Sequence, residues 1–432
     1  MSAVPIQELP GGLAWLNAPP ASLHDLRGRP LVLAFVNAAS AWCAQRLAEL
    51  AQWQARNPGR LQVLAVQVPR FDSERQPQRS IKLLRRQGVR FPVLLDADWA
   101  AWQRYGISAW PTLLLVDAEG RERERIVGLG GDLDRALSAL CEGMPRPLEE
   151  DLRPGPEAMP EPPLPLSFPA AVAAGPERLY VADSGHHRIL ECSHGGRVLR
   201  QFGLGTADLI DGPADQAAFN RPQGLALERE CLYVADTGNH AVRRIQLLTG
   251  QVDTLCGNGR PGDPVEGPVA ASARSPLNHP LGLAVAGNQL YVAGAGDHRI
   301  WSYDLGRGEL HLRAGTGELG LRDGNVRMAA FAQPTALAAV QQMLYVCDAL
   351  SSAVRSVQLR TDVVQTLVGQ GLWEYGDADG PRTGARLQHP LAVALSADAP
   401  LLWIADSGNG SLRTLRLGGG ELTTVSLPRR LH

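Results

Sequence analysis

The chain has 432 residues, of which 44% are hydrophobic and 20% charged, and its formal net charge is −2. This length exceeds what one hydrophobic core serves and predicts two or three domains of ordinary globular composition. The near-neutral charge argues against a broad electrostatic grip on nucleic acid, and no apolar run approaches the roughly 18 residues of a membrane-spanning helix.

The N-terminal residues show neither the basic nor the apolar region of a secretion signal, so we expect a cytoplasmic protein. The six cysteines are scattered at positions 43, 141, 192, 231, 256 and 347. We therefore expect free thiols, and neither a disulfide framework nor a metal site.

The first 143 residues alternate strand and helix patterns. Residues 31–35 form a continuous apolar run that is typical of a buried parallel strand, and residues 41–55 follow helical spacing. Further strands are expected at 61–68, 113–116 and 125–128, and further helices at 81–88, 98–105 and 132–141. This alternation predicts an α/β layered sheet.

Residues 144–169 carry nine prolines in 26 positions. Proline removes a backbone donor and fixes φ, so this segment is expected to be a semi-extended linker. We predict a first domain over residues 1–143, a linker over 144–166 and a second domain over 167–432.

One phrase recurs five times in the second domain, at starts that lie 53, 58, 54 and 58 residues apart. Its copies are Leu179-Tyr-Val-Ala-Asp183, Leu232-Tyr-Val-Ala-Asp236, Leu290-Tyr-Val-Ala-Gly294, Leu344-Tyr-Val-Cys-Asp348 and Leu402-Trp-Ile-Ala-Asp406. Each copy predicts a short strand followed by a turn, and such regular self-similarity indicates stacked repeats.

We expect four short strands in each repeat, which in the second copy are residues 224–227, 232–235, 241–246 and 251–256. Four strands per copy, followed by a joint rich in Gly, Asp and Pro, are typical of a propeller blade. The fifth copy finishes at residues 421–427, so the sequence predicts five blades rather than six.

The repeat phrase, with its Asp-Ser/Thr-Gly-Asn-His turn, resembles the NHL repeat. The N-terminal half resembles a thioredoxin: residues 35–43 (Phe-Val-Asn-Ala-Ala-Ser-Ala-Trp-Cys) correspond to the active-site loop, and residues 105–115 to the cis-proline loop. The order of the two domains resembles the family of NHL-repeat-containing protein 2 and its bacterial relatives. The resemblance implies a thioredoxin-like α/β domain followed by an all-β NHL propeller, which in that family has six blades.

A thioredoxin attacks disulfides with the first cysteine of Cys-x-x-Cys, and the second resolves the mixed disulfide. Counted without gaps, these positions are Ser40 and Cys43. A serine hydroxyl offers no thiolate but makes a good helix N-cap. We therefore expect no dithiol–disulfide oxidoreductase activity from this degenerate Ser-x-x-Cys site.

Two interpretations of Cys43 stay open. Ser40-x-x-Cys43 resembles the Thr-x-x-Cys of peroxiredoxins, which implies a monothiol role, although Val36 stands where that family has proline and Arg46 is only near. Otherwise Cys43 is a buried residual cysteine with an ordinary or raised pKa. A second register pairs Trp42 and Cys43 with the thioredoxin Trp-Cys and puts Arg46 at the resolving position, but it needs a three-residue insertion.

The resemblance also implies a cis peptide bond between Trp110 and Pro111, beside the active-site loop. Cis bonds form only about 5–6% of X–Pro bonds in folded proteins, so this expectation comes from the family context.

Polar residues recur at fixed positions of the repeat. Four residues after the phrase stand His187, His240 and His298, then Ser352 and Gly410. Since metal ligands sit about 2.0–2.1 Å from their ion, residues on successive blades are too far apart to share one, and we expect each to serve its own turn. The repeated aspartates are interpreted likewise as turn-formers.

Arginines recur seven residues after the phrase, as Arg243, Arg355 and Arg413. They either ring one surface and bind an acidic partner or lie on a solvated strand face.

We predict a scaffold in which the degenerate thioredoxin-like domain accompanies a propeller that binds a protein or peptide, without cofactor, metal, nucleic acid or membrane. The alternative is a monothiol redox enzyme or sensor, peroxidase or disulfide-linked, that uses Cys43. RNA binding, known for some NHL propellers, is a third hypothesis that the net charge disfavours.

Overall fold

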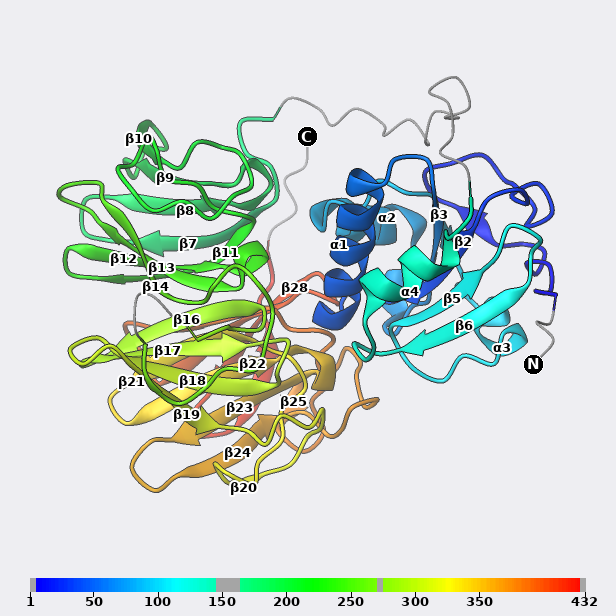
Figure 1. Ribbon diagram of the computed structural model, residues 1–432. Coiled ribbons are helices and arrows are strands. Elements are labelled where there is room, and N and C mark those ends of the chain that lie inside the picture. Colours follow the sequence, from blue (N-terminus) through cyan, green and yellow to red (C-terminus); the bar gives the residue numbers. More distant parts are fainter. Residues whose placement is uncertain (1–4, 145–163, 270–274, 428–432) are drawn as a thin grey trace. The chain divides into compact units, whose positions relative to one another are not determined.

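The computed structural model describes residues 5–144, 164–269 and 275–427. The chain divides into two compact units, Met1–Pro163 and Leu164–His432 (Figure 1). Residues 145–163, which make up most of the predicted linker, lie outside the described residues.

The first unit contains a six-stranded sheet in the order β1-β4-β3-β2-β5-β6. Its strands are β1 (Ala14–Trp15), β2 (Leu31–Val36), β3 (Gln62–Gln67), β4 (Val93–Leu95), β5 (Thr112–Val116) and β6 (Glu122–Val127). Strands β2, β3 and β4 are parallel, whereas β5 runs antiparallel to β2. All six residues of β2 are buried, as the unbroken apolar run predicted.

Helices cover both faces of this sheet. They are α1 (Ala41–Arg56), α2 (Pro77–Arg86), α3 (Ala100–Arg104) and α4 (Leu133–Leu140). One core contains Leu50 of α1, Leu84 of α2 and Leu137 of α4, and the core on the other face contains Ala101 of α3. The unit is therefore a thioredoxin-like α/β domain, as predicted.

The second unit is a five-bladed β-propeller, which confirms the predicted number of blades (Figure 1). Blade 1 consists of β7 (Pro169–Ala174), β8 (Leu179–Asp183), β9 (Arg188–Cys192) and β10 (Val198–Phe202), and blade 2 of β11 (Pro222–Glu228), β12 (Cys231–Asp236), β13 (Ala241–Gln246) and β14 (Val252–Cys256). Blade 3 consists of β16 (Pro280–Ala286), β17 (Gln289–Gly294), β18 (Arg299–Asp304) and β19 (Glu309–Ala314), and blade 4 of β21 (Pro334–Val340), β22 (Met343–Asp348), β23 (Ala353–Gln358) and β24 (Val363–Val368). Blade 5 consists of β26 (Ala392–Leu395), β27 (Leu401–Asp406), β28 (Ser411–Arg416) and β29 (Glu421–Thr424).

The joints add a feature that the sequence did not predict. In blades 3, 4 and 5 a two-residue strand from the preceding joint pairs with the outermost strand. These strands are β15 (Gly267–Pro268), β20 (Gly324–Asn325) and β25 (Gly380–Pro381).

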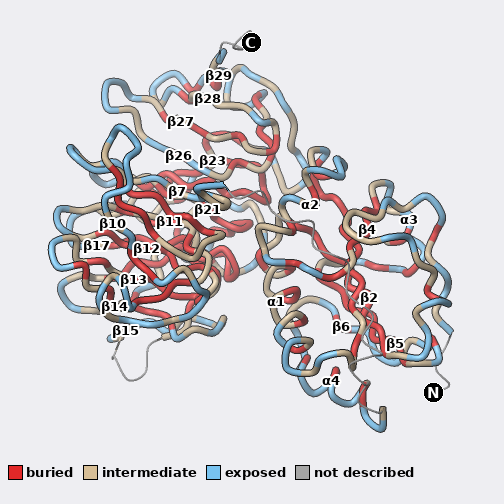
Figure 2. Tube along the Cα trace, turned by 90° about the horizontal axis from the view of Figure 1, so that it is seen from above, coloured by how far each residue is buried: buried red, intermediate tan, exposed pale blue. Residues whose placement is uncertain are grey.

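The propeller core lies between neighbouring blades, where the repeat phrase contributes to two interfaces at once. Tyr180 and Ala182 of blade 1 pack against Leu232 and Val234 of blade 2, and the same arrangement recurs from blade 2 through blade 5. Alternate residues of the phrase point to opposite faces of the sheet, so one phrase serves both neighbours. Figure 2 shows these buried strand segments in red.

Among the helices of the described residues, none combines the length and apolar character needed to cross a membrane.

Candidate functional site

The candidate redox site lies at one end of the thioredoxin-like sheet. Residues 37–40 leave β2 there and lead into α1. The Trp110–Pro111 peptide bond is cis, the geometry that the family resemblance implied. Phe35 of β2 pairs with Thr112 of β5, so Pro111 lies at the sheet end from which this loop departs.

Ser40 caps α1. It has an extended backbone (φ −87°, ψ 127°), and its side chain accepts a hydrogen bond from the backbone N–H of Cys43. This is the geometry of an N-cap residue. The hydroxyl therefore stabilises the helix start at the position where the resemblance implies an attacking thiolate.

Cys43 is completely buried in the core beneath α1. Its Sγ accepts a hydrogen bond of 3.2 Å from the backbone N–H of Asn37. Burial raises the pKa of the thiol to about 12. Hydrogen bonds with the Asn37 backbone and the Ser40 side chain oppose this shift, but desolvation outweighs them and keeps the sulfur protonated at neutral pH.

Arg46 does not serve Cys43 as a partner cation. Its guanidinium donates to the backbone carbonyls of Gly128 (3.0 Å) and Gly130 (2.7 Å) and pairs with Glu49 at 2.7 Å. These bonds fix α1 to the segment that follows β6.

A buried polar network, which no sequence pattern predicted, holds the loop between β2 and α1. The Asn37 amide donates to Glu74 (2.8 Å), which also accepts from the backbone N–H of Arg70, and Gln67 accepts from the backbone N–H of Ala38 (2.9 Å). Burial raises the pKa of the Glu74 carboxyl. No short motif signals this network, because its members come from separate elements.

Trp110 belongs to an aromatic cluster that was also not predicted. Its ring centroid lies 5.2 Å from that of Trp99 and 4.6 Å from that of Trp102. The cluster packs against the core that includes α3 and fixes the residue preceding the cis-proline.

The structure corrects both interpretations of the repeated arginines. The side chains of Arg243 and Arg355 are 0% exposed and that of Arg413 is 1% exposed, so they neither lie on a solvated face nor present a surface to an acidic partner. Each is paired instead with the aspartate that ends the repeat phrase of its own blade, as in Arg243–Asp236 at 2.9 Å.

Each of these arginines also holds the joint that precedes its blade. Arg243 pairs with Asp211 at 2.9 Å and Arg355 with Asp323 at 2.8 Å, and both donate to joint carbonyls. The recurring Asp-Gly of the joints is therefore an anchor for the buried arginine.

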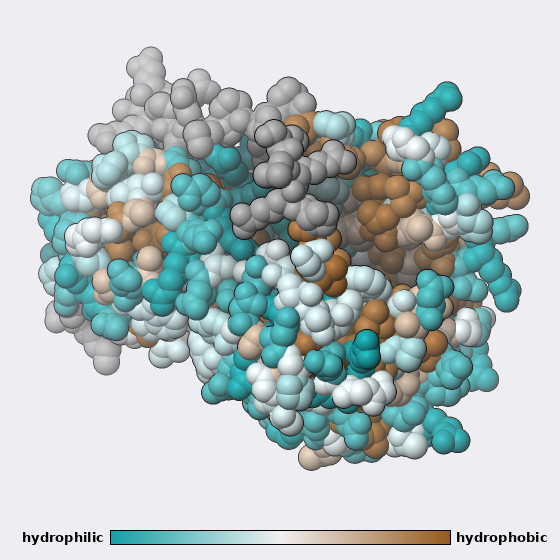
Figure 3. Space-filling model, turned by 180° about the vertical axis from the view of Figure 1, so that it is seen from behind, coloured by the Kyte–Doolittle hydropathy of each residue, from teal (hydrophilic) through white to brown (hydrophobic). Residues whose placement is uncertain are grey.

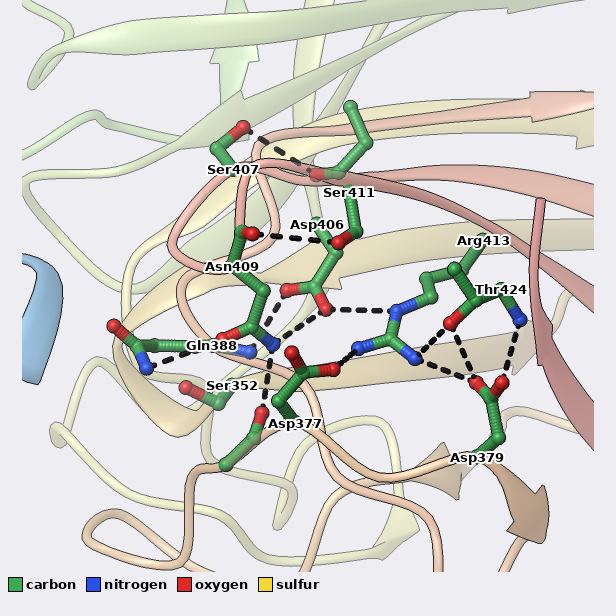
Figure 4. Close-up of polar contacts among 12 residues, drawn as sticks. Ser352, Asp377, Asp379, Gln388, Asp406, Ser407, Asn409, Ser411, Arg413 and Thr424 are labelled. Atoms are coloured by element: carbon green, nitrogen blue, oxygen red, sulfur yellow. Dashed lines mark hydrogen bonds and ion pairs between the residues drawn. The ribbon is translucent and has the colours of Figure 1, made fainter. Parts of the chain in front are cut away.

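Figure 4 shows this anchor in blade 5. Arg413 contacts the carboxylates of Asp377, Asp379 and Asp406, while Asn409 donates to Asp406 at 2.7 Å. Asp377 and Asp379 belong to the Asp-Ala-Asp-Gly sequence that partly resembles a calcium loop, and here they face a guanidinium. Within the described residues there is no cluster of His, Cys, Asp or Glu suited to a metal ion.

Blade 3 departs from this arrangement in a concerted way. Gly294 replaces the aspartate and Trp301 the arginine, and the Trp301 indole donates to Asp297 at 2.7 Å. Burial raises the pKa of Asp297 to about 7.

The repeated histidines connect neighbouring blades, which corrects the expectation that each serves its own turn. Nδ1 of His187, His240 and His298 accepts the backbone N–H of Arg221, His279 and Gln333, respectively, at 3.1–3.2 Å. In blade 4 the Ser352 hydroxyl accepts the backbone N–H of His389 at 3.2 Å. Each donor residue directly precedes, or nearly precedes, the inner strand of the following blade.

Comparison with known proteins is consistent with this architecture. Residues 12–124 match the AhpC/TSA family. The chain is 33% identical to chicken (Gallus gallus) NHL repeat-containing protein 2, covering 95% of this chain and 62% of the relative, and 32% identical to the human (Homo sapiens) protein, covering 98% and 63%. It is 31% identical to the chloroplastic protein SUPPRESSOR OF QUENCHING 1 of Arabidopsis thaliana, covering 96% of this chain and 42% of that protein.

The resemblance inferred from the sequence motifs is thus confirmed. The chain is similar to NHL repeat-containing protein 2 along nearly its whole length, and it spans less than two thirds of the length of these relatives.

Proposed function

We propose that this thioredoxin-like domain and NHL propeller form a scaffold that binds a protein or peptide partner and performs no dithiol chemistry. The observation that carries the proposal is the state of the redox site. Ser40 stands at the attacking position, and burial raises the pKa of Cys43, the one thiol of the motif, to about 12. Cys43 therefore stays protonated at neutral pH, and neither position of the motif offers a thiolate.

The binding half of the proposal is supported by the propeller. An array of five blades presents many loops on one rigid support, an arrangement suited to recognition. We assign residues 1–143 to the thioredoxin-like domain, 144–166 to the linker and 167–432 to the propeller; limited proteolysis that cuts first within 144–166 checks these bounds.

Insulin reduction with dithiothreitol tests the redox half. We expect the purified chain to reduce insulin no faster than the reductant alone, and brisk turnover would refute the proposal. Affinity capture from native lysate tests the binding half, and a chain that retains no partner reproducibly would count against it.

A monothiol redox enzyme or sensor is the second candidate, favoured by the match of residues 12–124 to the AhpC/TSA family. It requires fast oxidation of Cys43 by peroxide at neutral pH and its loss in Cys43→Ser. A pKa above about 8.5 for the Cys43 thiol, measured from the pH dependence of its labelling rate, would contradict this candidate.

We further propose that the protein works in a reducing compartment such as the cytoplasm, supported by its six free cysteines. Cell fractionation tests this location, and recovery in an oxidising compartment would refute it.

A further inference from the structure

An open cavity of about 1110 Å³ lies in the thioredoxin-like unit, at the end of the sheet where the parallel strands begin. Leu31 starts β2, Gln62 starts β3 and Pro92 directly precedes β4, and all three line the cavity. The redox loop leaves β2 at its other end, after Val36, which is about 17 Å away along the strand. The cavity is therefore a place separate from the redox loop.

Side-chain amides hold the walls of this cavity in place. Asn17 donates to the backbone carbonyl of Phe91 at 2.9 Å and accepts from the backbone N–H of Val93 at 2.8 Å, which ties the loop after β1 to the start of β4. Gln62 donates to the backbone carbonyl of Leu26 at 2.8 Å and ties the same loop to β3. Because its walls are bonded to one another, the cavity is pre-formed, as small-molecule sites usually are.

The lining of the cavity is mainly apolar. Trp15, Leu16 and Leu26 line it, and each packs against a core of the unit while part of its surface stays exposed. Figure 3 shows that apolar side chains reach the surface of the thioredoxin-like unit. Small-molecule sites typically measure about 300–1,000 Å³ and combine such a lining with a few polar groups, so the cavity has the size and character of one.

The charged groups of the cavity are mostly positive. Arg27, Arg29 and Arg90 line it together with one carboxylate, Asp25, which already accepts from the hydroxyl and the backbone N–H of Ser22. In the part of the chain that the structure describes, neither Arg27 nor Arg90 forms an ion pair with a carboxylate. Both side chains are exposed, so they lie at the rim of the cavity, where a charged group stays partly solvated. A guanidinium presents a planar pair of donors that matches the two oxygens of a carboxylate.

We propose that this cavity binds a small amphipathic carboxylate. Its apolar body lies against Trp15 and Leu26, and its anionic head lies at the rim beside Arg27 and Arg90. Charge complementarity selects the anion, because the one carboxylate of the lining is engaged by Ser22 and two arginines have no acidic partner. The site goes beyond the scaffold function and does not depend on it.

Two fluorescent probes of matched shape test the charge preference in the full-length chain. 1-Anilinonaphthalene-8-sulfonate carries an anionic head, and N-phenyl-1-naphthylamine is the same molecule without it. We expect the sulfonate to bind with a Kd of about 10–100 µM and the neutral probe to bind at least about tenfold more weakly. Decanoate should displace the sulfonate. Equal binding of the two probes, or no displacement by decanoate, would overturn the proposal.

Charge-reversal variants locate the site. The double variant Arg27→Glu/Arg90→Glu changes only exposed side chains, and it should weaken binding of the sulfonate at least about tenfold while leaving the neutral probe unchanged. Arg135→Glu, at an exposed position of α4 outside the cavity, is the matched control and should bind both probes like the wild type. Equal binding of the sulfonate by the double variant and the control would refute the assignment of the head group.

Two further measurements locate the apolar body. Ala51→Phe, on the α1 wall of the cavity, narrows it without a change of charge and should weaken binding of both probes. In the wild type, decanoate should slow hydrogen exchange in residues 16–31 and leave α4 unchanged. Unchanged exchange in residues 16–31, or full binding by Ala51→Phe, would mean that the ligand lies elsewhere and that the proposal fails.

Discussion

The hydrogen bond between His298 and the following blade predicts that the stability of the fold depends on pH in a specific way. Nδ1 of this buried histidine accepts the backbone N–H of Gln333 at 3.2 Å. Blade 4 makes the same bond with Ser352, whose φ of 50° is close to the 56° of His298. His298→Ser therefore keeps an acceptor in the same backbone conformation and removes the titrating group.

The magnitude follows from the pKa of His298, which burial lowers to about 4. An unperturbed histidine titrates near 6.5, so folding favours the neutral ring. The contribution to stability is complete above pH 6.5 and is lost as the pH falls toward 4, where the folded protein also accepts the proton. With about 1.4 kcal/mol per pKa unit, the loss between pH 7.5 and pH 5.0 is about 2 kcal/mol.

Urea unfolding of wild type and His298→Ser at pH 7.5 and pH 5.0 measures this effect. At pH 7.5 the variant is expected to be less stable, because serine leaves part of the pocket empty. At pH 5.0 the difference in the free energy of unfolding between the two proteins should shift by about 2 kcal/mol in favour of the variant. Asp297, with its pKa of about 7, is present in both proteins, so its titration cancels in the difference. Parallel pH profiles of the two proteins would refute the reasoning.

Three further predictions concern other buried groups. Arg243→Met should lower the free energy of unfolding by about 3–5 kcal/mol because it leaves Asp236 buried without its ion pair, and adding Asp236→Leu should recover part of that loss in the same denaturant assay. Maleimide at pH 7 should label the half-buried Cys231 well before Cys43, as followed by mass spectrometry of digests; equal rates would show that the site opens readily. Gly224→Ala should lower Tm, because a Cβ there would meet the backbone of the next blade at 1.9 Å; an unchanged Tm would mean that the blades can separate at no cost.

The sequence predicted those features that depend on one element and its period. The apolar run of β2, the helix α1 with its Ser40 cap and the five repeat phrases each carry a local pattern, and the structure contains all of them. Helix α2 begins four residues before its predicted start, because Pro77 suits the first turn of a helix. The short strands of the joints, such as β15, could not be predicted, since two residues carry no period.

The sequence pattern could not predict contacts between side chains that belong to different strands or joints. An arginine on alternate positions of a strand indicates a solvated face unless its carboxylates are known, and the partners of Arg243 lie seven and thirty-two residues away. The histidines were misassigned for the same reason, because their acceptor function involves the next blade. Most of these repeated polar residues are buried, although His187 is only half-buried, so a polar residue that recurs at one position of a repeat is a sign of structural hydrogen bonding.

The two kinds of repeat contact differ in what they require from a neighbouring blade. The arginine anchor is internal to a blade and its own joint, so blade 5 keeps it in full through Arg413. The histidine or serine bond instead needs a following blade, and at this position blade 5 has Gly410, which carries no side chain to accept it. The two contacts are therefore separable: one stabilises a blade with its own joint, and the other stabilises the interface between neighbouring blades.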